Sequence, residues 1–246
     1  MARFSSTASL ACTMVLALAI VTAAKADLMV VVPNALANTE GNGNNNFPFD
    51  STTPMRYQQV YAASQFSGGG GLITQIAFRP DGIVGNPFNV TIGNIQIDLS
   101  TTSAVPDALS TTFASNVGPN DTVVYNGALN LSSNDTGPAG GPKAFDITMD
   151  LNTPFLYDPA LGNLLLDVRN ISGLPSGAAG GFDSESLVGD SISRVYEDIG
   201  SATASVADTE GLVTAFTITP VPEPSALTLL AIAIGLVLLR FPRLSA

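Results

Sequence analysis

The chain has 246 residues, which is enough for one all-β domain or two small domains. It contains no histidine, no tryptophan and a single cysteine, Cys12, which lies in the apolar N-terminal stretch. Once that stretch is removed, the chain lacks the usual residues of zinc, copper and haem sites and of Ser-His or cysteine catalysis. From Asp27 to Pro220 there are five basic and nineteen acidic residues, a net charge of about −14 (5 − 19). This charge excludes nucleic acid as a partner, because its phosphates would be repelled.

The N-terminus has the organisation of a secretory signal peptide. Arg3 is followed by an apolar stretch from Ala8 to Ala23 and by the small-x-small pattern Ala24-Lys25-Ala26. Such a pattern predicts cleavage after Ala26 and export of the remaining chain. We therefore assign residues 1–26 to the signal peptide.

The next segment, residues 27–55, is rich in asparagine and glycine. Its central part, Asn34 to Pro54, contains too little apolar surface to offset the entropy of ordering, so we expect a loop or linker. Glu40 and Asp50 offer carboxylates for calcium, but their spacing matches no known calcium-binding loop.

Residues 56–220 show recurring alternation of apolar and polar side chains, which predicts strands with one buried face and one solvated face. The expected inward residues are Leu72, Ile76 and Phe78; Ile95, Ile97 and Leu99; Phe145, Ile147, Met149 and Leu151; Leu164, Leu166 and Val168; and Leu212, Thr214, Phe216 and Ile218. The expected outward residues include Gln75, Arg79, Asp98 and Asp167.

Turn signals separate these strands. Asn126-Gly127 lies between two apolar runs and predicts a type I′ hairpin, which requires two residues with positive φ. Long amphipathic helices are not indicated, and at most one helical turn is expected between Pro106 and Ser115. The pattern predicts an all-β fold, an antiparallel β-sandwich of jelly-roll type, over residues 56–220.

Carboxylates are the remaining candidates for chemistry. Asp146 and Asp150 share a strand face, but residues four apart along a strand are separated by about 13 Å, too far for a glycosidase pair. Asp183 and Glu185 follow Gly180-Gly181, and we expect a glycine-flanked loop in which they are weak candidates for calcium ligands. No other metal and no cofactor is expected.

Tyrosines offer a different function. Tyr57 and Tyr61 share a strand face with Gln59, an arrangement that suits a lectin-like surface on which sugars stack. Packing in the core or at a sheet edge explains the same pattern.

The C-terminal segment, residues 221–246, begins with Pro222-Glu223-Pro224, in which two prolines prevent a regular strand or helix. Ser225 can cap an apolar helix over residues 226–239. That helix would be about 21 Å long, shorter than a bilayer core of about 30 Å. Arg240 and Arg243 follow it and indicate a cytoplasmic end, with the body of the protein outside.

This combination of Pro-Glu-Pro, an apolar helix and terminal arginines resembles the PEP-CTERM sorting signal of Gram-negative bacteria and their relatives. The resemblance implies recognition and processing by an exosortase, a membrane transpeptidase, and delivery to the cell surface or extracellular matrix. It also implies an association with exopolysaccharide production. Here the basic cluster is thin, since Phe241-Pro242 separates its two arginines.

Together these observations predict a non-enzymatic exported protein. It would be anchored in the inner membrane as a precursor and then released to the cell surface or an exopolysaccharide matrix. A carbohydrate-binding, lectin-like module, with or without calcium, is the alternative. An acid-base glycosidase is the least favoured hypothesis.

Overall fold

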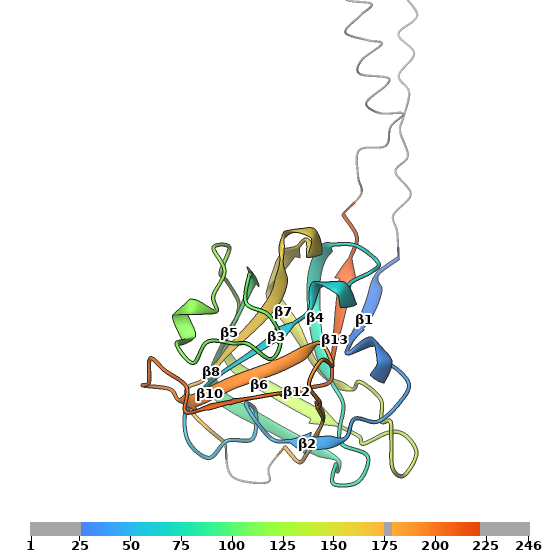
Figure 1. Ribbon diagram of the computed structural model, residues 1–246. Helices are drawn as coiled ribbons and strands as arrows, with labels where there is room; N and C mark the ends of the chain where they lie inside the picture. The colour runs from blue at the N-terminus through green and yellow to red at the C-terminus, as the bar shows by residue number, and fades with distance from the viewer. Residues whose placement is uncertain (1–25, 175–178, 222–246) are drawn as a thin grey trace, which may run out of the picture. The chain divides into compact units, whose positions relative to one another are not determined.

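The computed structural model describes residues 26–174 and 179–221 (Figure 1). Ala26, at the expected signal cleavage site, is exposed immediately before the first strand. Ala24 and the sorting-signal residues Pro222, Glu223, Pro224, Arg240 and Arg243 lie outside the described residues, as does the expected helix 226–239.

Two larger antiparallel sheets and one small sheet make up the described chain. The four-stranded sheet has the order β1 (Leu28–Val32), β13 (Thr214–Thr219), β4 (Gly71–Phe78), β7 (Ile147–Tyr157). The six-stranded sheet has the order β11 (Val206–Asp208), β10 (Ile192–Asp198), β3 (Met55–Tyr61), β8 (Asn163–Asn170), β5 (Phe88–Thr102), β6 (Thr122–Ser133). The small sheet has the order β12 (Glu210–Leu212), β9 (Phe182–Ser186), β2 (Gly43–Asn45).

The two larger sheets share one apolar core. Ile76 and Phe216 from the four-stranded sheet and Ile97 and Leu166 from the six-stranded sheet are fully buried in the same cluster. The core therefore lies between the sheets, and the predicted all-β, antiparallel, sandwich-like fold is confirmed.

Helical structure in the described residues is limited to four short 3₁₀ turns: η1 (Asn34–Leu36), η2 (Ala63–Gln65), η3 (Phe113–Ser115) and η4 (Pro159–Leu161). The third is the helical turn expected between Pro106 and Ser115. Within the described ranges, no helix has the length and apolar character that a membrane crossing requires.

The predicted hairpin at Asn126-Gly127 is wrong. Both residues lie inside the continuous strand β6, where Asn126 pairs with Gln96 and Gly127 pairs with Ile95 of β5. Gly127 has φ +134° next to a register shift in β5, so the glycine accommodates an irregularity of the ladder. Pairing along β5 overrides the local turn preference.

The predicted face of Leu72 is also wrong. A register shift between Ile73 and Gln75 interrupts the pairing of β4 with β7. Such a bulge reverses the alternation, so Ile73 is fully buried and Leu72 is only half-buried. Ile76 and Phe78, beyond the bulge, point into the core as predicted.

The expectation of a loop or linker over Asn34 to Pro54 is correct only in part: outside η1 and β2 the segment is an irregular loop, but it is not a separate linker. Within it, β2 pairs with β9, and the Phe49 side chain is fully buried in the main core. Upstream, β1 pairs with β13 along its whole length. Residues 27–55 are therefore part of the same packed unit as the rest of the described chain.

The two ends of this unit lie side by side (Figure 1). Leu28 at the start of β1 is paired with Ile218 near the end of β13. The Thr219 hydroxyl donates a hydrogen bond of 2.7 Å to Asp27 Oδ1. The first and last strands of the described unit therefore bring its two ends together.

Candidate functional site

Every basic side chain of the described residues takes part in an ion pair. The pairs are Arg56 with Asp167, Arg79 with Asp183, Lys143 with Asp135, Arg169 with Asp98 and Asp167, and Arg194 with Asp208 and Glu210. These cations are between 0% and 26% exposed. The accessible charge of this part of the chain is therefore predominantly negative.

One buried cluster brings three carboxylates together from distant parts of the chain. Ligand oxygens of Glu40, Asp81 and Asp183 all lie within 4.8 Å of one another. Asp81 follows β4, and its N–H donates to the Gly181 carbonyl at 3.0 Å. That contact places the end of β4 beside the beginning of β9, which carries Asp183.

Arg79 is the cation of this cluster, and the prediction that it faces solvent is wrong. Its side chain is fully buried, and its Nε donates to Asp183 Oδ2 at 2.6 Å. Its Nη2 donates to the Thr39 carbonyl at 2.5 Å. The guanidinium also lies 4.9 Å from the centre of the Phe145 ring. Segments before β2, after β4 and in β9 are held together by this one side chain.

Burial controls the protonation of the cluster. Desolvation raises the pKa of Asp183 to about 7, although the Arg79 guanidinium opposes the shift. Desolvation also raises the pKa of Glu40, against a hydrogen bond from Gly82 N–H and the charge of Arg79. The cluster thus resists carrying all of its negative charges at once.

Glu40, Asp81 and Asp183 are the described residues that could hold a cation, and most of their oxygens already accept hydrogen bonds. Asp183 Oδ1 accepts from Gly41 N–H at 3.0 Å, and Asp81 Oδ1 accepts from Val84 N–H at 2.7 Å. Glu40 Oε1 accepts from Gly82 N–H at 2.6 Å, whereas the buried Oε2 has no partner among the described residues. Calcium takes six to eight oxygen ligands, so the protein oxygens left over would fill only part of its coordination sphere.

Glu185 does not join this cluster. The predicted glycine-flanked loop is wrong, because Asp183 and Glu185 belong to strand β9. Glu185 accepts hydrogen bonds from the backbone and side-chain nitrogens of Asn42, at 3.0 and 2.9 Å. It therefore fastens the segment that precedes β2. The partners that the sequence did not reveal, Arg79 and Asp81, lie in a stretch that reads locally as a turn.

Asp146 and Asp150 have separate structural partners. Asp146 accepts from the Ser133 hydroxyl at 2.6 Å and from Asn134 N–H at 2.9 Å. Asp150 is exposed and accepts from Gln75 Nε2 at 2.7 Å. Neither carboxylate is aimed at a common substrate position.

Of the two explanations offered for Tyr57 and Tyr61, packing in the core is confirmed and the stacking surface is wrong, because both side chains are fully buried. The Tyr57 hydroxyl donates to Gln59 Oε1 at 2.5 Å. The Tyr61 hydroxyl lies 2.9 Å from Thr214 Oγ1. Burial raises the pKa of both hydroxyls. These tyrosines are core residues with internal hydrogen bonds, and no sugar can reach them.

A polar groove lies along residues 44–47 and 50–53 and has a volume of about 480 Å³. It is lined by asparagine, serine, threonine and aspartate side chains and by the partly exposed ring of Phe47. This size lies within the range of about 300–1,000 Å³ that is usual for small-ligand sites. Part of the segment expected to be a linker therefore lines a groove of ligand size.

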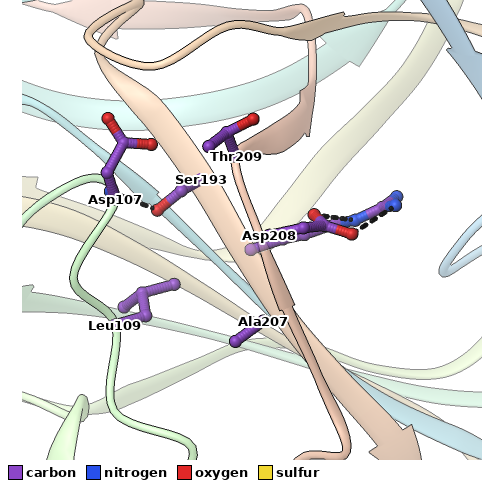
Figure 2. A pocket seen from close by; sticks show the side chains of 7 residues that line it. Asp107, Leu109, Ser193, Ala207, Asp208 and Thr209 are labelled. Atoms are coloured by element: carbon purple, nitrogen blue, oxygen red, sulfur yellow. Dashed lines mark hydrogen bonds and ion pairs between the residues drawn. The ribbon is translucent and has the colours of Figure 1, made fainter.

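A smaller cavity, of about 130 Å³, lies between the loop at Asp107 and the strands β10 and β11. Figure 2 shows Asp107 and Leu109 on one side and Ala207, Asp208 and Thr209 on the other. Asp107 N–H donates to Ser193 Oγ at 2.9 Å, and Asp208 accepts from Arg194 Nε at 2.9 Å. Its polar side chains are committed to each other, and its volume is too small for most organic ligands.

Comparison of the sequence with protein-family models and with curated proteins finds no match for this chain.

Proposed function

We propose that this chain is a non-enzymatic exported protein whose acidic β-sandwich acts at the cell surface or in an extracellular polysaccharide matrix. An exosortase would recognise Pro222-Glu223-Pro224 and process the precursor, which the apolar segment 226–239 would hold in the inner membrane. We further propose a jelly-roll-like strand order, since neighbours in the sheets, such as β3, β8 and β10, are distant in sequence.

The pairing of β1 with β13 carries this proposal. It brings the two ends of the folded body, from which the two apolar segments of the precursor continue, to one edge of a sheet. A domain whose two ends emerge together can fold outside the membrane while both segments still occupy the same bilayer. Ends on opposite sides of the fold would make that arrangement difficult.

The charge distribution supports the same conclusion. Because the five described cations are engaged internally, the hydrated surface is left acidic. A net charge far from zero keeps a protein soluble and limits non-specific association. These properties suit a protein that works outside the cell.

A carbohydrate-binding module with calcium is the second candidate, because Glu40, Asp81 and Asp183 converge and Glu40 Oε2 is unpaired within the described chain. Titration of the full chain with calcium chloride tests it. Binding that is lost in Glu40→Gln and retained in Glu197→Gln would support a calcium site at this cluster. Absence of binding to the unaltered chain would remove calcium from the proposal.

Sorting is tested by mass spectrometry of the protein recovered from its native host. We expect both ends to be missing from the surface or matrix fraction. Replacing Pro222, Glu223 and Pro224 together by alanine should leave the tail intact and the protein in the membrane fraction. Pro220→Ala, a proline change outside the motif, is the matched control. An intact tail on a cytosolic protein would contradict the proposal.

A further inference from the structure

The groove along residues 44–47 and 50–53 is preformed by bonds that its own backbone makes. The N–H groups of Phe49 and Asp50 donate to the Asn46 carbonyl at 3.1 and 2.8 Å. The Pro48 carbonyl accepts from Asn170 Nδ2 at 3.0 Å. Since Phe49 is fully buried in the main core, the floor of the groove is anchored and needs little reorganisation to receive a ligand.

Some polar side chains of the groove are used internally and others are not. Asn45 is used internally, with its amide bonded to the carbonyl and the N–H of Phe47 at 3.0 and 3.1 Å. The side chains of Asn44, Asn46 and Thr52 make no hydrogen bond within the described residues. They present amide and hydroxyl groups, each able to donate and to accept.

An aromatic ring completes the groove. Phe47 is partly exposed, and its ring packs on Tyr196 with a centroid distance of 5.2 Å and an interplanar angle of 56°. This contact holds the ring in place. An exposed, fixed ring beside amides and hydroxyls can contact the C–H face of a sugar while the polar groups bind its hydroxyls.

The net charge of the protein favours neutral sugars over acidic sugars as ligands. The body carries a net charge of about −14, and no described basic side chain lines the groove. A uronate or sulfate would meet an acidic surface with no cation to receive it. From these observations we infer that residues 44–53 form a binding site for a neutral glycan. The inference gives the second candidate function a site and a ligand class, and it rests on neither the sorting signal nor calcium.

The test is a panel of soluble tetrasaccharides presented to the full chain in mild detergent. The neutral arm contains glucose, galactose, mannose and N-acetylglucosamine oligomers, and the acidic arm contains uronic acid oligomers. Each affinity is measured by calorimetry with a chelator present. We expect at least one neutral oligomer to bind with a Kd below about 1 mM and the acidic arm to bind more weakly. No neutral binding, or preferential acidic binding, would overturn the inference.

Substitutions in the groove test whether the glycan binds there. Asn44→Ala with Asn46→Ala should weaken it by about tenfold, since two hydrogen bonds are lost. Thr52→Val, which keeps the shape of an exposed side chain, should weaken it less and serves if the double variant unfolds. Asn152→Ala, an exposed asparagine on β7, is the matched control. Unchanged affinity in the groove variants, or loss only in the control, would overturn the assignment. Either failure leaves export and processing untouched, so the two proposals are judged separately.

Discussion

The outer faces of the two larger sheets have the same alternating sequence pattern but lie in different environments. On β7 of the four-stranded sheet, Thr148 and Asp150 are exposed, as alternation predicts. On β5 and β8 of the six-stranded sheet, Asp98 and Asp167 occupy equivalent outward positions and are only 1% and 2% exposed. The difference shows that alternation identifies which way a side chain points and not whether water reaches it.

The segment between β5 and β6 causes this difference in exposure. It crosses the outer face of the six-stranded sheet and buries Phe113 against Val195 of β10. Asn116 Nδ2 donates to Gln58 Oε1 at 2.9 Å, and Gln58 Nε2 donates to the Phe113 carbonyl at 3.2 Å. Asp150 is exposed, with no comparable layer over it among the described segments. Carboxylates under such a cover require partners, because an unpaired buried charge is costly.

Those partners form a continuous network. Asp98 and Asp167 face each other across the β5–β8 ladder, and like charges in direct opposition are unfavourable. Arg169 binds both of them, and Arg56 Nη2 donates to Asp167 Oδ2 at 2.5 Å. The guanidinium of Arg56 also lies 4.7 Å from the Phe113 ring centre. The network therefore ties the covering segment to the sheet.

The largest expected effect comes from removing the shared carboxylate. Asp167→Ala leaves Arg56 and Arg169 without their common partner under the covering segment. We expect the free energy of unfolding to fall by about 3–5 kcal/mol, measured by urea denaturation. Asp167→Asn, which retains the shape and some hydrogen bonds, should cost less. A loss below about 1 kcal/mol for the alanine variant would mean that the face is not sealed from water.

The stability of the protein should depend on pH through Asp183, a buried carboxylate outside the Asp98–Asp167 network. Its pKa is raised from 3.8 to about 7 by desolvation, so between these values the native state binds a proton that the unfolded state has released. The free energy of unfolding should therefore fall as pH rises from about 4 to about 7, by up to about 4 kcal/mol from this group.

Asp183→Asn should remove this contribution and flatten the slope, because the amide cannot titrate. Denaturation curves of both proteins at several pH values provide the measurement. Glu40 and Asp190, whose pKa values are also raised by desolvation, would still contribute a slope of the same sign. Identical slopes for the variant and the unaltered chain would show that Asp183 stays ionised throughout this range.

A smaller loss is expected from Asn116→Ala, which tests the cover itself. This buried side chain bonds to Gln58 and also donates to the Ser110 carbonyl at 2.8 Å. Its removal should cost about 1–3 kcal/mol and increase amide hydrogen exchange in residues 103–121. Unchanged exchange there would indicate that the segment is held by Phe113 alone.

The smallest effect should come from the uncovered face. Asp150→Ala removes an exposed carboxylate bonded to Gln75, and we expect the free energy of unfolding to change by less than about 0.5 kcal/mol. Thermal unfolding measured beside Asp167→Ala gives the direct contrast. A loss similar to that of Asp167→Ala would remove the distinction between the two faces.

Local sequence predicted the inner faces well. Ile95, Ile97 and Leu99 are buried as expected, and so are Leu212, Thr214, Phe216 and Ile218, because the pleat of a strand sends alternate side chains to opposite sides. Composition alone excluded histidine chemistry. Alternation did not predict the bulge at Ile73 or the irregular pairing at Gly127, because both depend on the partner strand and not on neighbours in the chain.

The candidate sites were less predictable. The sequence identified Asp183 and Glu40 as separate candidate carboxylates. It did not predict that they lie beside Asp81 and Arg79, because that arrangement depends on contacts between distant residues, such as the hydrogen bond from Arg79 to Asp183, more than a hundred positions apart. The groove was missed because a run of asparagines and glycines resembles a linker until Phe49 is seen in the core.

The amino-acid sequence by itself determined the strand faces away from the bulges, the acidic charge and the absence of histidine from the chain. Only the tertiary structure decided which outward carboxylates are buried, which cation neutralises each of them and which polar side chains remain available to a ligand. The physical reason is that burial and pairing are properties of contacts between distant segments. Their free energies depend on what lies opposite a side chain, and one strand's own residues do not specify that.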